Sequence, residues 1–246
     1  MGVPDILNIS WVSRIFRPDI PDIRVVIVSS NNGGSMVYLL TGLLSPAWMM
    51  SRFERRIRRE GFRVSTISYG HLRQRAAVSA EDFGRRLDAL EDDDVHLVVH
   101  SFGGLVLLHL FEQSSPQRLA KIRSVVFLGS PLTGSEVTRH LLQSRLGGFW
   151  RWFFGTALDR GLAGNQPPFE PPPVKCLLVA GTGNAMFARL IWSETQPGDG
   201  LVSVGEAQPK NAQANIVEHT IDLGHAELIY RSAAMDLVVE HLRNPA

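Results

Sequence analysis

The feature that most constrains the fold of this chain is a regular alternation of short apolar runs with longer segments of helical spacing. Val, Ile and Leu dominate the short runs, and several of these contain almost no polar residue. Parallel strands covered by helices on both faces have this composition, and consecutive parallel strands need a crossover connection. The pattern therefore predicts an α/β fold with a mostly parallel central sheet flanked by helices. The expected strands are residues 24–29, 36–40, 62–67, 95–99, 124–128, 174–180 and 215–221.

Residue types that favour helix ends mark the segments between these strands. Ser45 and Pro46 are typical of a helix start, and Gly61 is typical of the position just after a helix end. Between them, Phe53 and Ile57 have the spacing of an apolar stripe. We therefore expect a helix in this segment.

Two further helices are expected later in the chain. Ser79 and Asp82 resemble a capping box at a helix start, and Phe83 and Leu87 follow at helical spacing. The apolar spacing over residues 227–242 predicts a closing helix.

The length of 246 residues suits one large domain, which we expect to span residues 1–246. Two segments interrupt the alternation of strands and helices. Five aromatic residues fall within residues 149–154, and five prolines fall within residues 166–173. We therefore expect an insertion between strands at about residues 135–173.

Charge and cysteine content exclude several classes of function. The chain has 25 basic and 24 acidic residues, a net charge of +1, so it lacks the global field that attracts nucleic acid. A single cysteine, Cys176, excludes an intramolecular disulfide and a multi-cysteine zinc site. We expect no nucleic-acid partner and an inert, buried Cys176.

The distribution of apolar residues along the chain predicts where the protein is located. No apolar run approaches the roughly 18 residues of a membrane span, and the first residues lack the basic and apolar segments of a secretory signal. The expected localisation is cytoplasmic.

Residues 97–106 run from an apolar strand through Ser101 into an apolar helix without a loop. Such a tight turn strains the serine backbone and exposes its side chain at the strand end. Gly103 relieves crowding two residues later, and Gly104 lets helix and strand pack closely. The helix N-terminus adds backbone N–H groups beside the serine. Ser101 is therefore a candidate nucleophile, and the alternative is an ordinary helix N-cap.

This segment resembles the nucleophile turn of the α/β-hydrolase family, and especially of its lipase-like members, which is written Gly-x-Ser-x-Gly. Ser101 and Gly103 match the pattern, whereas Val99 occupies the place of the first glycine. The resemblance implies an α/β-hydrolase fold with a cap or lid insertion and Ser101 as the nucleophile.

A second similarity follows the expected strand 36–40, where the chain continues Thr41-Gly42-Leu43-Leu44. The family commonly has His-Gly here, followed by a residue whose backbone N–H helps to form the oxyanion hole. The resemblance thus implies the N–H groups of Leu43 and Phe102 as the oxyanion donors. Thr41 stands in place of the usual histidine.

Two further landmarks lie near the C-terminus. The stretch Gly-Asp-Gly-Leu-Val around Asp199 is similar to the segment that carries the triad acid in lipase-like members, and His225 follows the last expected strand. The chain order Ser101, Asp199, His225 is the family's order. Asp222 and Glu136 are alternatives for the acid, and for His225 the alternative is capping of the following helix.

The segment 127–135 is similar to the Gly-Ser-Pro segment that leads into the lid of lipases. In the family, the expected insertion forms a cap over the acyl pocket. Its aromatic residues have three interpretations: a core for the cap, an acyl-binding lid, or an anchor on a lipid surface. These substrate-binding or lid candidates are Phe149, Trp150, Trp152, Phe153 and Phe154.

Together these similarities predict an esterase or lipase that cleaves carboxylic esters with apolar acyl groups through a Ser-His-Asp triad and an acyl-enzyme. The expected substrate is a small-molecule or lipid ester, with no metal or organic cofactor and with peripheral membrane contact through the cap. An acyltransferase or thioesterase with the same triad is an alternative. A catalytically inactive, ligand-binding member is another, because Val99 and Thr41 depart from the family pattern.

Overall fold

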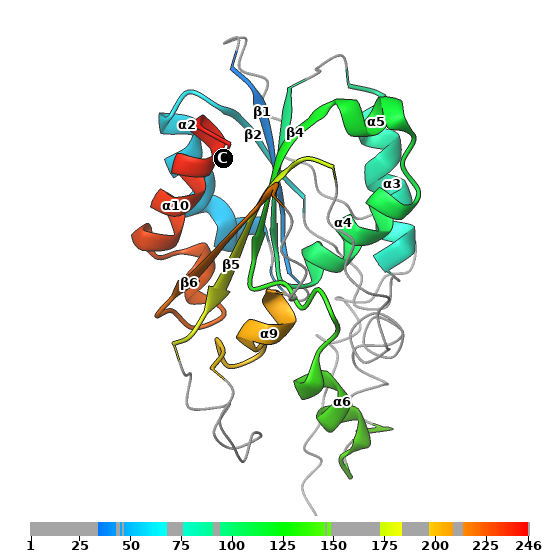
Figure 1. Ribbon diagram of the computed structural model, residues 1–246, viewed down its shortest axis with the longest axis vertical. Helices are drawn as coiled ribbons and strands as arrows, with labels where there is room; N and C mark the ends of the chain where they lie inside the picture. The colour runs from blue at the N-terminus through cyan, green and yellow to red at the C-terminus, as the bar shows by residue number, and fades with distance from the viewer. Residues whose placement is uncertain are drawn as a thin grey trace, which may run out of the picture.

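The computed structural model describes residues 34–42, 45, 47–67, 76–90, 94–145, 147–148, 173–183, 197–208 and 214–245. Its centre is a six-stranded sheet in the order β2-β1-β3-β4-β5-β6, in which every neighbouring pair is parallel (Figure 1). The predicted α/β fold with a parallel sheet is confirmed. The strands are β1 (Met36–Leu40), β2 (Arg63–Ile67), β3 (Val95–His100), β4 (Ile122–Leu128), β5 (Lys175–Gly181) and β6 (Ile216–Ile221).

These strands agree closely with the apolar runs in the sequence. Strands β1 to β5 are mostly buried, whereas β6, at the edge of the sheet, is mostly exposed. The expected strand at residues 24–29 lies outside the described residues. In β3, all six residues are buried, which explains its unbroken apolar character.

Helices form a layer on each face of the sheet (Figure 1). One layer contains α3 (Ala76–Asp88), α4 (Phe102–Glu112) and α5 (Pro116–Ala120), and the other contains α2 (Ser51–Arg59) and α10 (Ser232–Arg243). Short elements at the carboxyl end of the strands are α6 (Glu136–Gln143) and α9 (Val204–Ala207). The 3-10 turns η1 (Ala47–Met50) and η3 (Glu227–Ile229) precede α2 and α10, respectively.

Side chains that alternate along each strand divide the interior into two apolar cores. In β3, Leu97 and Val99 belong to the core that includes Phe83 of α3. The intervening Val98 belongs to the core on the other face, with Phe53 of α2. This alternation follows from strand geometry. Because both faces of the strand are filled by core side chains, polar candidate residues lie at the strand ends.

The helix expected after residue 45 is present but begins differently. It starts as the 3-10 turn η1 and continues directly into α2, whose Phe53 and Ile57 are buried as the stripe predicts. Gly61 has φ +91°, and its N–H donates to the carbonyl of Arg58, as expected for a residue that ends a helix.

The other two helix expectations need correction. Ser79 lies inside α3, since the helix is already formed at Ala76, and its buried side chain caps nothing. The apolar spacing extends upstream of Ser79, and this spacing outweighs the local capping motif. The closing segment is divided into η3 and α10, with a break at Tyr230 and Arg231.

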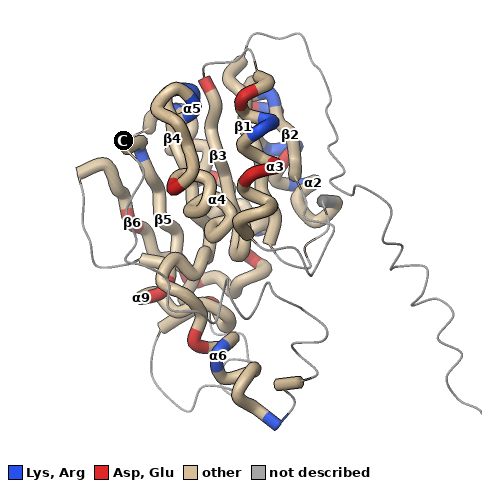
Figure 2. The backbone as a smooth tube through the Cα atoms, turned by 90° about the vertical axis from the view of Figure 1, so that its right-hand side faces the viewer, with Lys and Arg blue, Asp and Glu red and all other residues tan. Residues whose placement is uncertain are grey.

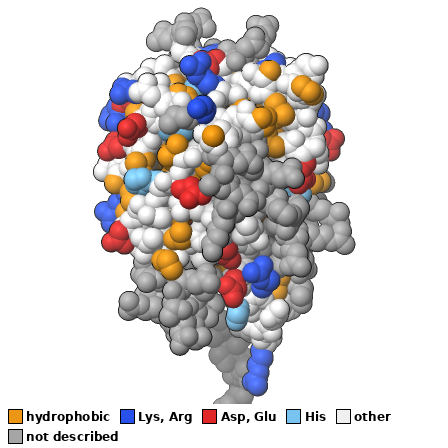
Figure 3. All heavy atoms as spheres, in the orientation of Figure 1, with side chains coloured by type: hydrophobic (Ala, Val, Ile, Leu, Met, Phe, Trp, Pro, Cys, Tyr) orange, Lys and Arg blue, Asp and Glu red, His pale blue; other side chains and the backbone are white. Residues whose placement is uncertain are grey.

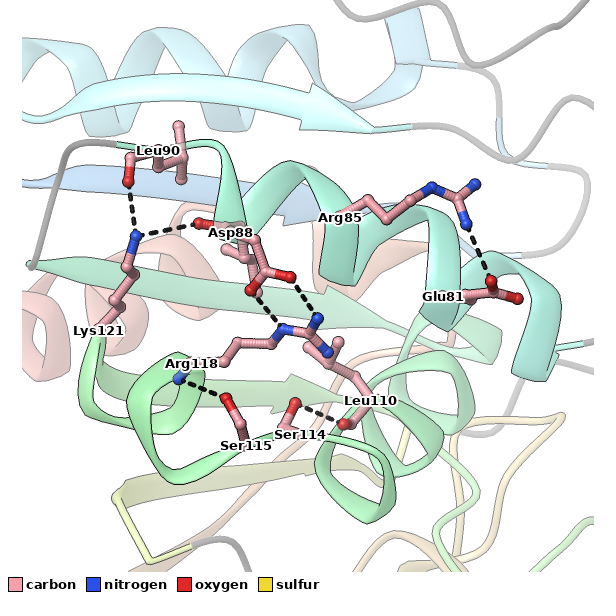
Figure 4. A network of polar contacts seen from close by, with 10 residues as sticks. Glu81, Arg85, Asp88, Leu90, Leu110, Ser114, Ser115, Arg118 and Lys121 are labelled. Carbon is pink, nitrogen blue, oxygen red and sulfur yellow. Dashed lines mark hydrogen bonds and ion pairs between the residues drawn. The ribbon is translucent and has the colours of Figure 1, made fainter.

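Polar contacts join α3 to α5 at the end of the sheet opposite the strand carboxyl ends (Figure 4). The Arg118 guanidinium donates through Nε and Nη2 to the Asp88 carboxylate, at 2.8 and 2.5 Å. This hydrogen-bonded contact lowers the pKa of Asp88. Lys121 Nζ donates to the carbonyl of Leu90 at 2.6 Å, beyond the last turn of α3. These bonds hold the C-terminal end of α3 against α5.

Charged residues of both signs are mixed over the described helices and strand ends (Figure 2). On the face drawn in Figure 3, basic and acidic side chains are likewise interspersed. No helix among the described residues is long and apolar enough to cross a membrane.

Candidate active site

Ser101 stands at the turn between β3 and α4, with φ +55° and ψ −122°. It is the one non-glycine residue with positive φ among the described residues. Its N–H donates to the carbonyl of Leu128 in β4, at 3.0 Å, and its own carbonyl accepts from Gly104 N–H, at 3.0 Å. A backbone in this region costs about 1–3 kcal/mol and is held only by surrounding contacts. The chain therefore makes the strained turn that the sequence predicts.

Close packing explains the two glycines after Ser101. A Cβ on Gly103 would lie 3.0 Å from the carbonyl oxygen of Leu40, and one on Gly104 would lie 2.4 Å from Cβ of Ser130. Side chains at these positions would push α4 away from the sheet.

Val99, the departure from the family pattern, is fully buried in the core beneath the turn. It lies between Leu40 of β1 and Phe127 of β4 in the strand register. The valine side chain thus contributes to the core, and the turn at Ser101 still forms.

Asp199 and His225 are in direct contact. Nδ1 of His225 donates to Oδ2 of Asp199 at 2.7 Å, and the backbone N–H of His225 donates to the Asp199 carbonyl at 2.9 Å. The Asp199 side chain is 1% exposed, and its Oδ1 accepts from the N–H groups of Leu201 and Val202, at 3.0 and 2.8 Å. A buried carboxylate needs such partners, and these hold it in one orientation toward the imidazole.

The two alternative acids are placed differently. Asp222 is exposed and Glu136 is half-buried, and neither has a hydrogen bond or ion pair with His225 within the described ranges. The carboxylate beside His225 is therefore that of Asp199.

Gly129, at the end of β4, is a site residue that sequence reasoning missed. It has φ +53°, and a Cβ here would lie 2.8 Å from Oδ2 of Asp199 and 3.3 Å from Nδ1 of His225. The residue thus makes room for the Asp199–His225 contact. Its place in the Gly-Ser-Pro segment was the available signal, but the function of the glycine depends on distant residues.

The structure brings Ser101, Asp199 and His225 to the same end of the sheet. Ser101 bonds to Leu128, the neighbour of Gly129, and His100 bonds to the carbonyl of His225. Among the described residues, no hydrogen bond joins Ser101 Oγ to His225. Such contacts are often long in the absence of substrate and tighten when it binds. The catalytic roles of the three residues stay predictions.

The segment after β1 packs directly on Ser101. A Cβ on Gly42 would lie 2.9 Å from Cβ and 3.4 Å from Oγ of Ser101. Phe102 is the first residue of α4, so its backbone N–H lies next to the same side chain. Leu43, the other expected oxyanion donor, lies outside the described residues.

Only the start of the expected insertion is described. Ser135 caps α6 by accepting from Thr138 N–H at 3.2 Å, and Oε1 of Glu206 in α9 accepts from Glu136 N–H at 2.6 Å. Burial raises the pKa of the Glu206 carboxyl. The bond to Glu206 attaches α6 to α9, and the existence of a cap stays a prediction. The lid candidates lie outside the described residues, namely Phe149, Trp150, Trp152, Phe153 and Phe154.

Other reactive side chains lie away from this site. Cys176 is buried in β5, and burial raises the pKa of its thiol to about 12, which makes it a poor nucleophile. Within the described ranges, no three His, Cys, Asp or Glu side chains are grouped as they would be around a metal ion.

Comparisons with known proteins agree with this architecture. The family model described as "alpha/beta hydrolase fold" matches residues 47–166. The mature form of the lipase BlEst2 from Bacillus licheniformis is similar in structure, with a TM-score of 0.71 and 14% identity, over 88% of this chain and 95% of that one.

Two other solved structures have the same fold. Lipase B from Aspergillus fumigatus has a TM-score of 0.65 and 16% identity, over 90% of this chain and 56% of that one. The metagenomic carboxyl esterase MGS0156 has a TM-score of 0.65 and 17% identity, over 87% of this chain and 75% of that one. A search of curated protein sequences found no match.

The family model thus matches a segment that includes the strained turn after β3. This turn belongs to a parallel sheet with a layer of helices on each face. At such low identities, the solved structures support the fold alone. The chain therefore has the α/β-hydrolase fold, and its residues 47–166 match the model of that family.

Proposed function

We propose that this protein is a serine hydrolase that cleaves carboxylic esters with apolar acyl groups. The observation that carries the proposal is the 2.7 Å contact between Asp199 and His225 beside the strained turn at Ser101. A serine hydroxyl is a weak nucleophile unless a neighbouring base removes its proton, and the base in turn needs a group that orients it. Ser101, His225 and Asp199 would supply these three functions.

The reaction has two steps. Ser101 Oγ attacks the ester carbonyl carbon while Nε2 of His225 accepts the hydroxyl proton. The tetrahedral intermediate collapses, the C–O bond to the alcohol breaks, and His225 returns the proton to the departing alcohol. A water molecule then attacks the acyl-enzyme in the same way, which releases the acid and restores Ser101.

Asp199 orients the imidazole in this scheme. Because its carboxylate accepts from Nδ1–H, the lone pair of the neutral ring lies on Nε2, where a base is required. The backbone bond from His225 N–H to the Asp199 carbonyl keeps the two loops in register. The carboxylate also stabilises the imidazolium that forms during each step.

The negative charge that develops on the carbonyl oxygen needs fixed donors. Phe102 N–H at the start of α4 is one candidate, and Leu43 N–H, one residue after Gly42, is the other. Preorganised backbone amides stabilise an oxyanion without reorganising, and removing one donor costs about 10²–10³ in rate. The reaction needs neither a metal ion nor an organic cofactor.

Support for an ester substrate comes from the solved structures that share the fold, which include a lipase and a carboxyl esterase. The aromatic residues at 149–154 favour an apolar acyl group, since we expect them to cover the acyl pocket. Both arguments concern the class of substrate.

The proposal is tested by fluorophosphonate labelling and by hydrolysis of nitrophenyl butyrate at neutral pH. We expect the wild type to be labelled and active, and Ser101→Ala to lose both properties. Ser114→Ala is a matched control, because Ser114 lies in the turn after α4 and its hydroxyl donates to the carbonyl of Leu110. A folded wild type that is inert in both assays would contradict the proposal, as would full activity of Ser101→Ala.

A further inference from the structure

We infer that His100 is a positioning residue that holds the His225 loop against the nucleophile turn, with Thr41 as its second partner. The inference rests on the proposed function, because its consequence is the placement of His225 relative to Ser101. His100 is the last residue of β3 and directly precedes Ser101.

The contacts between His100 and His225 support the first part of the inference, the positioning of the His225 loop. His100 is 2% exposed, and its Nε2 lies 3.1 Å from the backbone oxygen of His225. The two imidazole rings pack with their centroids 4.7 Å apart and a tilt of 43°. The residue next to Ser101 in the chain therefore contacts both the backbone and the ring of His225.

Burial defines the protonation state of His100. Desolvation, followed by the nearby His225, lowers the pKa of His100 to about 3, so the ring is neutral at neutral pH. A neutral imidazole has one N–H, and a backbone carbonyl can only accept. The proton must therefore be on Nε2, and Nδ1 is left as a buried acceptor.

Thr41 is positioned to satisfy that acceptor. The parallel register pairs Leu40 with Val99, so the next residues along, Thr41 and His100, are neighbours on the same face of the sheet. Both His100 Nδ1 and Thr41 Oγ1 are buried without a hydrogen-bond partner among the described residues. The Thr41 hydroxyl can donate and the unpaired Nδ1 of His100 can accept, and one buried water between them would satisfy both.

The consequence concerns the reacting geometry. Asp199 restrains Nδ1 and the backbone N–H of His225, and His100 restrains the carbonyl of the same residue. A loop held at three points has little freedom to rotate its imidazole away from Ser101. Misplacement of a catalytic group by 1 Å costs about 10²-fold in rate, so loss of the His100 bond should lower kcat rather than raise KM.

The test compares His100→Phe with His100→Gln and Thr41→Val. We expect His100→Phe to lower kcat by about 10–100-fold with little change in KM. His100→Gln should recover most of this loss, because its amide N–H can donate to the His225 carbonyl. Thr41→Val removes the hydroxyl at nearly constant volume and should lower kcat by a smaller factor.

His96→Phe is the matched control. His96 is a buried histidine near the other end of the same strand, and its side chain points to the same face of the sheet. We expect this variant to lose stability but to keep kcat. If His96→Phe lowers kcat as much as His100→Phe does, or if His100→Gln recovers nothing, the effect of His100 is one of packing and the inference is wrong.

Two further measurements separate this inference from the proposed function. The ¹⁵N shifts of labelled histidine should show His100 as a neutral Nε2–H tautomer down to about pH 5, and an Nδ1–H tautomer would overturn the inference. If the wild type is active and His100→Phe is equally active, only the inference fails. If the wild type itself is inert, the proposed function fails and the inference fails with it.

Discussion

β3 carries a buried histidine near each end, and the two side chains have different surroundings. Near the amino end, Nδ1 of His96 pairs with Oγ of Ser124 on the neighbouring strand, at 2.7 Å. At the carboxyl end, His100 contacts His225, which is 125 residues away in the chain, and leaves Nδ1 without a partner among the described residues. One histidine completes a contact within the sheet, whereas the other connects the sheet to a loop.

The backbone conformation at the carboxyl end of the sheet is also unusual. Ser101 and Gly129, both at carboxyl ends of strands, have φ values of +55° and +53°. The opposite end of the sheet carries the ordinary helix-to-helix contacts between Arg118 and Asp88 (Figure 4). The strained serine turn thus lies at the carboxyl end of the sheet, together with the unpaired atoms Thr41 Oγ1, His100 Nδ1 and Ser130 Oγ. Open parallel sheets place their sites at this end. The following predictions test this difference between the two ends.

The largest effect is expected from Asp199→Asn at the carboxyl end. The amide cannot hold the Nδ1–H tautomer as the carboxylate does, so kcat should fall by about 10³–10⁴-fold. Steady-state hydrolysis of nitrophenyl butyrate measures this change. Asp222→Asn is the control and should leave kcat unchanged, since the exposed Asp222 does not contact His225. Comparable losses in the two variants would show that the wrong acid has been assigned.

Acid should destabilise the protein through the histidines of β3. Burial lowers the pKa of His96 to about 4 and that of His100 to about 3, and in the unfolded chain both have ordinary values of about 6.5. The unfolded state therefore binds more protons below pH 6.5, so stability is complete above that pH and falls as the pH drops toward 4. For His96 alone, the loss is on the order of 3 kcal/mol.

Urea unfolding between pH 8 and pH 4.5 measures this dependence. His96→Phe should show a shallower decline than the wild type, because one of the shifted groups is gone. Equal slopes for the two proteins would mean that His96 does not carry the effect.

An intermediate effect is expected from Gly129→Ala. Its Cβ would meet Oδ2 of Asp199 and Cδ1 of Leu228, both at 2.8 Å, in a backbone region that side chains disfavour. We expect a loss of about 2–3 kcal/mol in stability, together with reduced kcat. Gly61→Ala is the control, because Gly61 also has positive φ but open space around it, so backbone strain of about 1 kcal/mol acts alone. Thermal unfolding and kcat of both variants would distinguish crowding of the site from backbone strain.

The smallest effect is expected from Ser124→Ala at the amino end. Loss of the hydroxyl leaves His96 Nδ1 without its partner, which costs about 1–2 kcal/mol of stability. Because the change lies at the other end of the strand from the turn at Ser101, kcat should stay close to that of the wild type. A marked fall in kcat with no loss of stability would contradict the expectation that changes at the amino end affect stability and not catalysis.

Local pattern was sufficient for much of the fold. Residues 95–99 were predicted as a strand, and β3 extends from Val95 to His100. The turn at Ser101 was also predictable, since an apolar run that passes through serine into a helix leaves no room for a loop. Ser79 shows where local motifs fail, because apolar spacing upstream extends α3 past its capping motif.

The sequence by itself determined the parallel α/β architecture and the order of Ser101, Asp199 and His225 along the chain. Apolar periodicity and turn chemistry are local properties, and they are visible in neighbouring residues. Only the tertiary structure decided that Asp199 rather than Asp222 contacts His225, that Gly129 makes room for that contact, and that His100 holds the carbonyl of His225. Each of these depends on residues brought together across the sheet, and no local pattern encodes such distances.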